Sequence, residues 1–352
     1  MELKALKDLD REMLELSLML KQLADSPGSE SKERALMVSE ERDRLLWRKA
    51  QHTAFEKYLR DQSMTAFEQK ALHSLQSTTG GYSVSPLSAM EILSKAQMFA
   101  PIRQYATVRT LLTGDAYPLP KETSRPDVRW VTETDPRPLM NGLTFGGELI
   151  PTHIMNTTFP VAAKLLEDPA FDLEEWLINW SVLTAFLEEE AKQFLVGNGI
   201  GAPEGLLVRP GVGEVKSGSA TTLTVDGVSG LYHQLPQVFR RRAVWLMNAA
   251  TLRVLSGLKD TDGQPVLRQT TTGDTILGRP VLEDPNMPDI ASGAWPIAMS
   301  GDLSYYWIID RIPLAVLRDP FSNKPNVVFD CVRRVGGQLV EPAAVVKQVI
   351  SA

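Results

Sequence analysis

The feature that most constrains the fold is the composition of the first 70 residues. They contain 27 charged side chains, and their one proline and one glycine stand together at Pro27-Gly28. Because proline and glycine interrupt helices, this composition predicts two helical stretches separated at residues 27–28. From about Ser74 onward the sequence is that of a compact α/β protein, which we expect to fold without the helical arm.

Apolar residues recur at alternating three- and four-residue steps in the first stretch, the spacing of a coiled-coil seam. The seam residues are Leu6, Leu9, Met13, Leu16, Leu20 and Leu23. A second helical stretch is expected from Glu30 to about Lys70. Two interpretations stay open: a solvated helical hairpin or dimerising coiled coil, and a temporary scaffold whose short, weak seam organises neighbouring copies. The linker at 62–85 is either ordinary or, at Gln76–Gly81, a place for a processing protease to cut.

Composition excludes several classes of protein. Among 352 residues the net charge is −6, and the part after residue 70 is itself mildly acidic, which disfavours tight binding to nucleic acid phosphates. Cys331 is the one cysteine, so no intrachain disulfide can form. The start of the chain lacks the pattern of a signal peptide, and no apolar run reaches the roughly 18 residues of a membrane span. We therefore expect a soluble, intracellular protein.

The region after the linker predicts a projecting hairpin. A short helix at Ala89–Ala96 leads into an extended stretch at Ile102–Leu112, followed by a polar segment with strand-like Val128–Val131. Two such arms joined by a polar tip are marginally stable alone. Since few apolar residues lie near the tip, we expect it to lie on another copy of the chain.

A long amphipathic helix is expected at 171–194, capped by Asp172 and ended by a left-handed Gly197. Strands are expected before it, at 143–166. A second α/β unit then begins after residue 222, with Asp226 capping a helix to Phe239 and Asn248 capping another to Leu258. The strands expected in this unit are Ala243–Met247, Leu277–Leu282, Pro296–Ser300, Tyr305–Asp310, Pro313–Arg318 and Val327–Val335. The apolar end, Val340–Val349, is expected to dock on the first unit.

The sequence offers little catalytic chemistry. The four histidines, His52, His73, His153 and His233, have no metal-ligand spacing, and no motif of a nucleotide-binding loop or a hydrolase occurs. Glu188-Glu-Glu190 is either a carboxylate cluster or, as we favour, a solvated helix face. Arg240-Arg-Arg242 complements a helix dipole, with a phosphate or subunit contact as the alternative. We expect no cofactor and no metal.

Several short motifs occur in an order that resembles the major capsid proteins of tailed bacteriophages with the Hong Kong 97 fold. They are Val244-Trp-Leu-Met-Asn-Ala-Ala-Thr-Leu252 with Leu258-Lys-Asp-Thr-Asp-Gly263, Leu277-Gly-Arg-Pro-Val281 with Asn286-Met-Pro288, Gly301-Asp-Leu303 with Tyr306, Arg333-Arg-Val-Gly-Gly337, and the loop Gly197–Leu206. The resemblance covers nearly the whole chain.

The resemblance implies a mixed α/β (α+β) capsid fold and a domain assignment. It implies a helical scaffolding domain at 1–72 that is cleaved in some relatives, an N-arm at 73–103, an extended loop at 104–137, a peripheral domain at 138–221 with the spine helix 171–194, an axial domain at 222–335, and a return to the peripheral domain at 336–352.

The resemblance also implies a structural protein, not an enzyme, that assembles with itself into hexamers and pentamers of an icosahedral shell. Expected partners are a portal protein, a maturation protease and packaged double-stranded DNA bound without sequence specificity, with no membrane; assembly is expected in the host cytoplasm and residence in the virion. Candidate subunit contacts are Lys121, Glu122, Arg125, Arg129, Trp130, Glu188, Glu189, Arg240, Arg241 and Arg242.

Lys121, expected near the loop tip, is expected to form salt bridges in an uncross-linked shell. The alternatives are an encapsulin-type shell protein and an α/β enzyme dimerised by a coiled coil.

Overall fold

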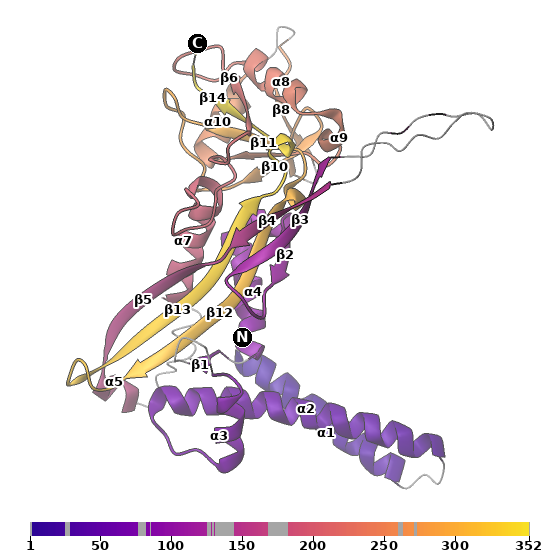
Figure 1. The fold of residues 1–352 in the computed structure, drawn as a ribbon, viewed down its shortest axis with the longest axis vertical. Coiled ribbons are helices and arrows are strands. Elements are labelled where there is room, and N and C mark those ends of the chain that lie inside the picture. Colours follow the sequence, from indigo (N-terminus) through magenta and orange to yellow (C-terminus); the bar gives the residue numbers. More distant parts are fainter. Residues whose placement is uncertain are drawn as a thin grey trace. The chain divides into compact units, whose positions relative to one another are not determined.

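The computed structural model (Figure 1) describes residues 2–24, 29–76, 82–84, 86–124, 128, 130, 144–167, 182–259, 263–270 and 273–351. The chain divides into two compact units. The first unit comprises Met1–Gln104, Ile154–Ala191 and Ile312–Arg334, and the second comprises Tyr105–His153, Lys192–Arg311 and Val335–Ala352. Each unit is described by itself.

Helices α1 (Glu2–Ala24), α2 (Ser29–Arg60) and α3 (Ala66–His73) form the N-terminal part of the first unit. The expected second helical stretch is broken because Asp61 adopts a left-handed φ of 59°. A new helix then begins at a capping box, in which the Thr65 hydroxyl accepts from the Glu68 backbone amide and the Glu68 carboxylate accepts from the Thr65 amide. The pattern Thr-x-x-Glu was present in the sequence and marks this boundary.

The first unit also contains sheet strands and further helices. Its strands are β1 (Tyr82–Ser83), β5 (His153–Ala162) from Ile154 onward, the later part of β12 (Tyr306–Asp319) and the earlier part of β13 (Asn326–Leu339), in the order β1-β12-β13-β5. Helices α4 (Pro86–Phe99) and α5 (Ala163–Glu167), the 3-10 helix η1 (Pro101–Gln104) and the start of α7 (Val182–Val196) complete it. The two strands predicted at 305–310 and 313–318 are one continuous strand, β12.

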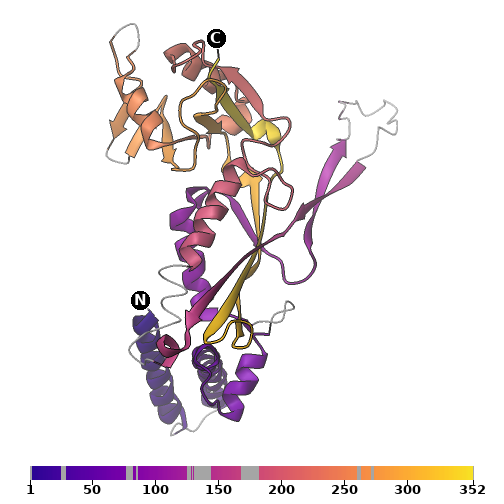
Figure 2. The same ribbon diagram turned by 90° about the vertical axis from the view of Figure 1, so that its left-hand side faces the viewer.

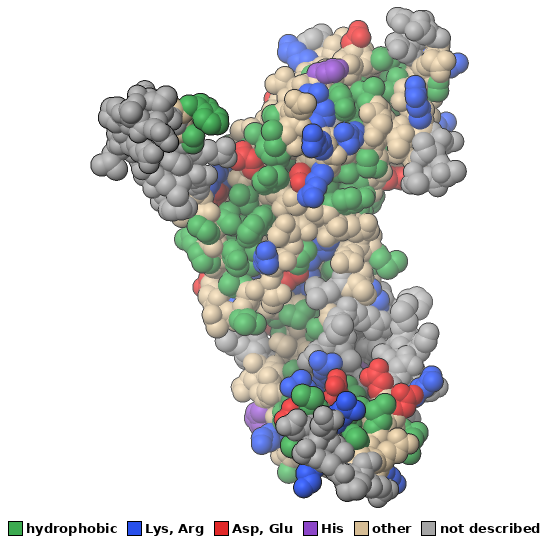
Figure 3. Space-filling model, turned by 90° about the vertical axis from the view of Figure 1, so that its right-hand side faces the viewer, with side chains coloured by type: hydrophobic (Ala, Val, Ile, Leu, Met, Phe, Trp, Pro, Cys, Tyr) green, Lys and Arg blue, Asp and Glu red, His purple; other side chains and the backbone are tan. Residues whose placement is uncertain are grey.

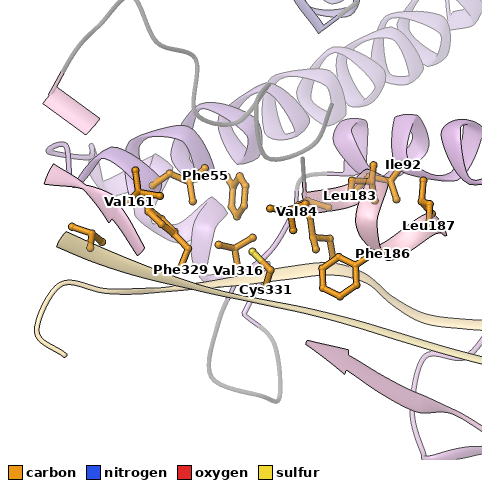
Figure 4. Close-up of a cluster of buried hydrophobic side chains, with 14 of the residues drawn as sticks. Phe55, Val84, Ile92, Val161, Leu183, Phe186, Leu187, Val316, Phe329 and Cys331 are labelled. Atoms are coloured by element: carbon orange, nitrogen blue, oxygen red, sulfur yellow. The ribbon is translucent and has the colours of Figure 1, made fainter. Parts of the chain in front are cut away.

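The core of the first unit gathers apolar side chains from elements far apart in the sequence (Figure 4). Leu314 and Val316 of β12, and Phe329 and Cys331 of β13, lie together with Ile92, Val161, Leu183 and Leu187. Phe55 and Leu59 of α2 belong to the same cluster, each with 1% of its surface exposed. The end of the helical arm is therefore part of this core, whereas the sequence analysis expected the rest of the chain to be independent of the arm.

The second unit is built on a seven-stranded sheet of order β6-β14-β11-β7-β10-β9-β8. The strands are β6 (Gly213–Lys216), β7 (Val244–Met247), β8 (Leu267–Thr270), β9 (Gly273–Ile276), β10 (Arg279–Glu283), β11 (Ile297–Ser300) and β14 (Val345–Val349), with the 3-10 helices η3 (Leu303–Tyr305) and η4 (Pro342–Ala344) nearby in sequence. All four residues of β7 are buried, as expected for a central strand covered on both faces.

Three helices of the second unit follow the sequence prediction in part. Asn248 caps α10 (Ala249–Gly257), because its Oδ1 accepts from the Thr251 amide at 2.8 Å. Asp226 is not a cap: Thr224 caps α8 (Val225–Gln234), its hydroxyl accepting from the Gly227 amide. The predicted helix to Phe239 is broken by Pro236, after which α9 (Gln237–Arg240) begins.

The segment Val340–Val349, expected to dock on the α/β region before residue 211, contributes β14 to the seven-stranded sheet, and its Lys347 Nζ donates to the Leu207 carbonyl oxygen at 2.8 Å. β14 pairs antiparallel with β11 on one side and parallel with β6 on the other. Its first four residues are all buried, and Val346 and Ile350 belong to the core of the second unit. An apolar run predicts a buried strand but not its neighbours, so the pairing with β11 and β6 could not be derived from the sequence.

Gly197 does not take the left-handed conformation predicted for it. The left-handed glycines of this loop are Gly199 and Gly201, with φ of 74° and 71°. Gly197 is needed for space, since a Cβ there would lie 2.1 Å from the Pro203 carbonyl oxygen and 2.5 Å from that of Gln193. The first half of the predicted helix, 171–181, including Asp172, lies outside the described residues; the described helix α7 continues to Val196.

Candidate assembly surfaces

A β-hairpin extends from the second unit, but its arms differ from those predicted. β3 (Ala116–Ser124) pairs antiparallel with β4 (Thr144–Pro151), and Figures 1 and 2 show the pair standing away from the seven-stranded sheet. The predicted first arm, Ile102–Leu112, instead holds η1 and the short strand β2 (Thr107–Thr110), which pairs parallel with β12. The returning arm lies about 15 residues later than Val128–Val131 because the polar segment between the arms is longer than expected.

The base of the hairpin is fixed to its own chain by an apolar cluster. Leu119 of β3 and Ile150 of β4 are buried against Ile309 of β12, with Tyr117 and Trp307 packed beside them. The ring centroids of the last two lie 5.8 Å apart. This packing supplies the support that an isolated two-stranded ribbon lacks.

Polar groups reinforce the same base. Glu148 of β4 accepts from Arg209 and from Gln338 Nε2, the latter at 2.6 Å, and Arg209 also binds Glu204 at 2.5 Å. Burial opposes the charge of Arg209, yet the carboxylates of Glu148 and Glu204 hold its pKa above the usual value. The network therefore keeps a charged guanidinium at the junction of the hairpin with the rest of the second unit.

Lys121 lies within this network. It stands opposite Gly146 on β3, and its Nζ lies 3.5 Å from Glu148 Oε2 and 3.3 Å from the Val340 carbonyl oxygen. The expectation of a salt bridge is met within the chain itself.

Further out, two large apolar side chains are almost fully exposed. Trp130 has 99% and Val128 92% of its surface accessible. A tryptophan without contacts in its own chain is a candidate for contact with another molecule. Arg125 and Arg129 lie outside the described residues, and Glu122 is on β3 but its side chain is not described.

The three consecutive glutamates of α7 divide between surface and interior. Glu188 and Glu189 are exposed, as predicted for a solvated helix face. Glu190 is buried between two arginines: its Oε1 accepts from Arg103 Nε at 2.7 Å and its Oε2 from Arg333 Nε at 2.8 Å. Arg333 also donates to the Pro313 carbonyl oxygen at 2.6 Å. This Arg103–Glu190–Arg333 triad ties η1, α7, β12 and β13 together within the first unit.

In the basic run 240–242 of the second unit, Arg240 is half-buried and the other two arginines are exposed. Figure 3 shows exposed Lys and Arg side chains on one face of the molecule. Arg240 donates to the carbonyl oxygens of His233 and Leu235 at 3.0 and 2.8 Å, at the end of α8, which is the expected helix-terminal role. Arg242 is exposed and lies 3.6 Å from Asp302, and Arg241 is exposed too. Arg241 and Arg242 remain available for contact with another molecule.

The predicted seam of α1 packs within the chain. Met13, Leu16, Leu20 and Leu23 are half-buried, while Leu14 and Leu18 between them are exposed; the side chains of Leu6 and Leu9 are outside the described ones. An ion pair between Asp10 and Lys49 places α1 antiparallel to α2. Near the other end, Met19, Leu23, Met37 and Val38 line a groove of about 430 Å³. A helical hairpin is thus present within the chain, and it leaves Leu14 and Leu18 of α1 exposed.

Three observations on the described residues concern possible chemical activity: metal-ligating clusters, the cavity beside α8, and the single cysteine. Among the described residues, no three His, Cys, Asp or Glu side chains gather as a metal site, and no helix is long and apolar enough to cross a membrane. A cavity of about 600 Å³ between α8 and the β8–β9 strands is lined mainly by apolar side chains, with Tyr232 and Arg268 but no carboxylate, histidine or cysteine. Burial raises the pKa of Cys331 to about 12, so its thiol is unreactive at neutral pH.

Comparison with known proteins decides among the remaining classes. A family model described as the phage capsid family matches residues 80–350, more than three quarters of the sequence. The chain belongs to the phage capsid family. The match to this capsid family begins just before β1 and ends at the last described strand. No curated protein matches significantly.

Solved capsid structures agree with the family. The capsid of a native GTA particle is 31% identical, with a TM-score of 0.63 over 71% of this chain and 90% of that chain. Gordonia phage Cozz is 15% identical, with a TM-score of 0.53 over 72% and 87%. The encapsulin of Synechococcus elongatus PCC 7942 is 12% identical, with a TM-score of 0.54 over 72% and 88%, and at this identity shows the fold alone.

The predicted class is therefore confirmed: this is a tailed-phage capsid protein with the Hong Kong 97-like α+β fold, a structural protein and not an enzyme. The triad at Glu190 is the site feature that the sequence analysis missed. Its members are 87 and 143 residues apart, and no local pattern links them. The sequence held one signal for it. Glu190 falls on the apolar side of α7, whereas Glu188 and Glu189 fall on the exposed side.

Proposed function

We propose that many copies of this capsid protein assemble into hexamers and pentamers of an icosahedral shell that encloses double-stranded DNA. The observation that carries this proposal is the 31% identity, over most of both chains, to the capsid of a GTA particle. Encapsulins share the fold, but the similarity to the Synechococcus protein is much lower, at 12% identity. The phage-type shell is therefore the better supported of the two.

The hairpin is the element proposed to reach a neighbouring copy. Its base is held by the chain's own Glu148–Arg209 network, while Val128 and Trp130 beyond it are exposed. A hairpin with a fixed base and exposed apolar side chains suits a heterologous contact between subunits. In such a contact each copy binds the next, and the subunits close into a ring. Further proposed contacts are Lys121, Glu122, Arg125, Arg129, Glu188, Glu189, Arg240, Arg241 and Arg242.

Residues 1–72 are proposed to act as a fused scaffold during assembly. The exposed apolar groove of the α1–α2 hairpin and its mixed charges suit weak, reversible contacts between copies. Removal of this segment by a maturation protease, cutting between about Asp61 and Gly81, is part of the proposal. A portal protein and assembly in the host cytoplasm belong to it as well. The domain limits at 73–103, 104–137, 138–221, 222–335 and 336–352 are proposed with it.

The net charge supports a container more than a nucleic acid binder. With a net charge of −6 the protein lacks the excess of cations that tight phosphate binding needs. An acidic inner surface would repel packaged DNA and let it move during filling and release. DNA contact without sequence specificity follows from this reasoning.

Electron microscopy of the purified protein tests the proposal, with Trp130→Ala as the informative variant. The natural chain should form large hollow particles, and the variant should form fewer of them at the same protein concentration. Because the Trp130 side chain is 99% exposed, the variant subunit should melt within about 2 °C of the natural one. A natural chain that stays monomeric or dimeric under all assembly conditions would contradict shell formation.

Particle contents separate the two shell types. Particles from the native source should protect double-stranded DNA from nuclease, whereas an encapsulin shell should contain a cargo protein and no protected DNA. Mass spectrometry of the same particles should show chains that begin between about Asp61 and Gly81. Chains that begin at Met1 in DNA-filled particles would defeat the removal of the arm but not the shell.

A further inference from the structure

Helix α2 changes character along its length. Leu36 and Met37 in its first half are 64% and 72% exposed. In its last three turns, Ala54, Phe55 and Leu59 are almost completely buried. The first part of the helix belongs to the arm and the last part belongs to the core of the first unit.

The buried turns pack in one apolar cluster with strands that follow much later in the sequence. Phe55 and Leu59 lie in one apolar cluster with Leu314 and Val316 of β12 and Phe329 of β13 (Figure 4). All of these side chains are within the first unit. Their packing is therefore a property of a single compact body.

Polar contacts fix the same turns beside this cluster. The Tyr58 hydroxyl accepts from the Arg318 backbone amide at 3.0 Å, and the Tyr58 ring packs edge-on against Tyr82 with centroids 4.7 Å apart. Asp61 pairs with the Arg318 guanidinium at 3.2 Å. These contacts join α2, which precedes residues 77–81 in the sequence, to β1 and β12, which follow them.

We propose that the apolar surface of β12 and β13 in this cluster is a helix-binding site that retains the N-terminal segment by non-covalent contacts after the linker is cut. This inference rests on the proposed removal of the arm and adds that cutting and release are separate steps. The ligand that fits is an amphipathic helix with aromatic or leucine side chains at spacing i, i+3 and i+4, as Phe55, Tyr58 and Leu59 have in α2. Release uncovers apolar side chains of β12 and β13, so it requires the first unit to rearrange around the vacated site.

The test uses the full chain, unassembled, with a recognition sequence for a site-specific protease inserted between Thr78 and Gly81. After cleavage, size-exclusion chromatography and native mass spectrometry report whether the fragment stays bound. The natural fragment should co-elute with the body at micromolar concentration. Phe55→Ala together with Leu59→Ala should release it about a hundredfold faster, since two buried anchors are lost.

A matched control lies on the same helix. Leu36→Ala with Met37→Ala removes apolar side chains of similar size from exposed positions and should leave retention unchanged. Where the Phe55 and Leu59 double variant fails to fold before cleavage, Leu59→Val should give a smaller acceleration in the same direction. A natural fragment that separates at once, with no gain in hydrophobic-dye binding by the body, would overturn the inference.

The protease in this experiment is supplied by the experimenter. This experiment therefore measures retention of the N-terminal fragment whether or not the chain is cut during natural assembly. The proposed natural cleavage is tested separately, by the masses of the chains in particles from the native source.

Discussion

Replacing Glu190 by Gln tests whether the first unit depends on its buried triad. The carboxylate is 1% exposed and each of its two oxygens accepts from a different arginine. Glutamine has nearly the same volume, but it replaces one acceptor oxygen with an NH₂ donor that would face an arginine N–H. The variant therefore leaves Arg103 and Arg333 buried without the carboxylate that they share, and it creates one donor–donor contact.

The magnitude follows from those losses. Breaking a buried ion pair by removing one partner costs about 3–5 kcal/mol, because the remaining charge is uncompensated. A compact unit of this size loses about 2–4 °C in melting temperature per kcal/mol. Glu190→Gln should thus lower the melting temperature of the unassembled subunit by between about 6 and 20 °C, measured by differential scanning fluorimetry.

Two controls sharpen this experiment. Glu188→Gln, an exposed position on the same helix, should stay within about 0.5 kcal/mol of the natural protein. Converting Arg103, Glu190 and Arg333 together to Met removes all three charges and should recover most of the stability, since a well-packed apolar triad replaces a buried ionic one. If Glu190→Gln melts within about 2 °C of the natural chain, the reasoning about the triad is refuted.

Three further predictions concern single residues. Burial raises the pKa of Cys331 to about 12, so iodoacetamide should label this thiol in urea but not in the folded chain at pH 8. The free energy of unfolding should fall as the pH rises from about 8.5 toward 12, because in this range only the unfolded thiol loses its proton. Equal labelling rates in the two states would contradict the reasoning. Asn248→Ala should cost at least about 1–2 kcal/mol in urea unfolding through loss of the cap to Thr251, and Asn248→Ser should restore the cap but not the Nδ2 contacts with Met287 and Asp289. Leu277 is half-exposed and has a left-handed φ of 49° in the turn between β9 and β10. Leu277→Asn should stabilise the second unit by about 0.5–1 kcal/mol, because Asn tolerates this conformation better. A destabilised variant would show that the Leu277 side chain contributes packing.

Local patterns predicted the elements well wherever the signal lies within a few residues. The charged stretch without Gly or Pro gave α1 and α2, and Asn248 gave the start of α10. The seam of α1 was recognised, but not its partner, because an a/d pattern is the same whether it faces another copy or α2 of its own chain. The hairpin was expected, yet its arms were shifted, since a polar segment has no feature that fixes its length.

Long-range pairings were beyond the sequence for a physical reason. The position of β14 between β6 and β11, and the capture of Glu190 by Arg103 and Arg333, depend on which surfaces meet after the chain has folded. The capsid motifs around Val244–Leu252 and Arg333–Gly337 carried the recognition of the family because they occur at sites with strict requirements. A Cβ on Gly337, for example, would lie 2.6 Å from the Tyr306 hydroxyl, so only glycine fits there.

The exposure of Trp130 sets a limit on how strongly one hairpin can hold a neighbour. A tryptophan buries about 150–250 Å², which at about 25 cal/mol per Å² contributes about 4–6 kcal/mol. Association of two molecules costs about 4–15 kcal/mol in lost translation and rotation. One hairpin therefore cannot hold a pair of subunits, whereas a ring gives each copy several such contacts for a single loss of freedom. A shell built this way forms only above a threshold concentration, and a misplaced subunit, held by one contact, dissociates before it is trapped.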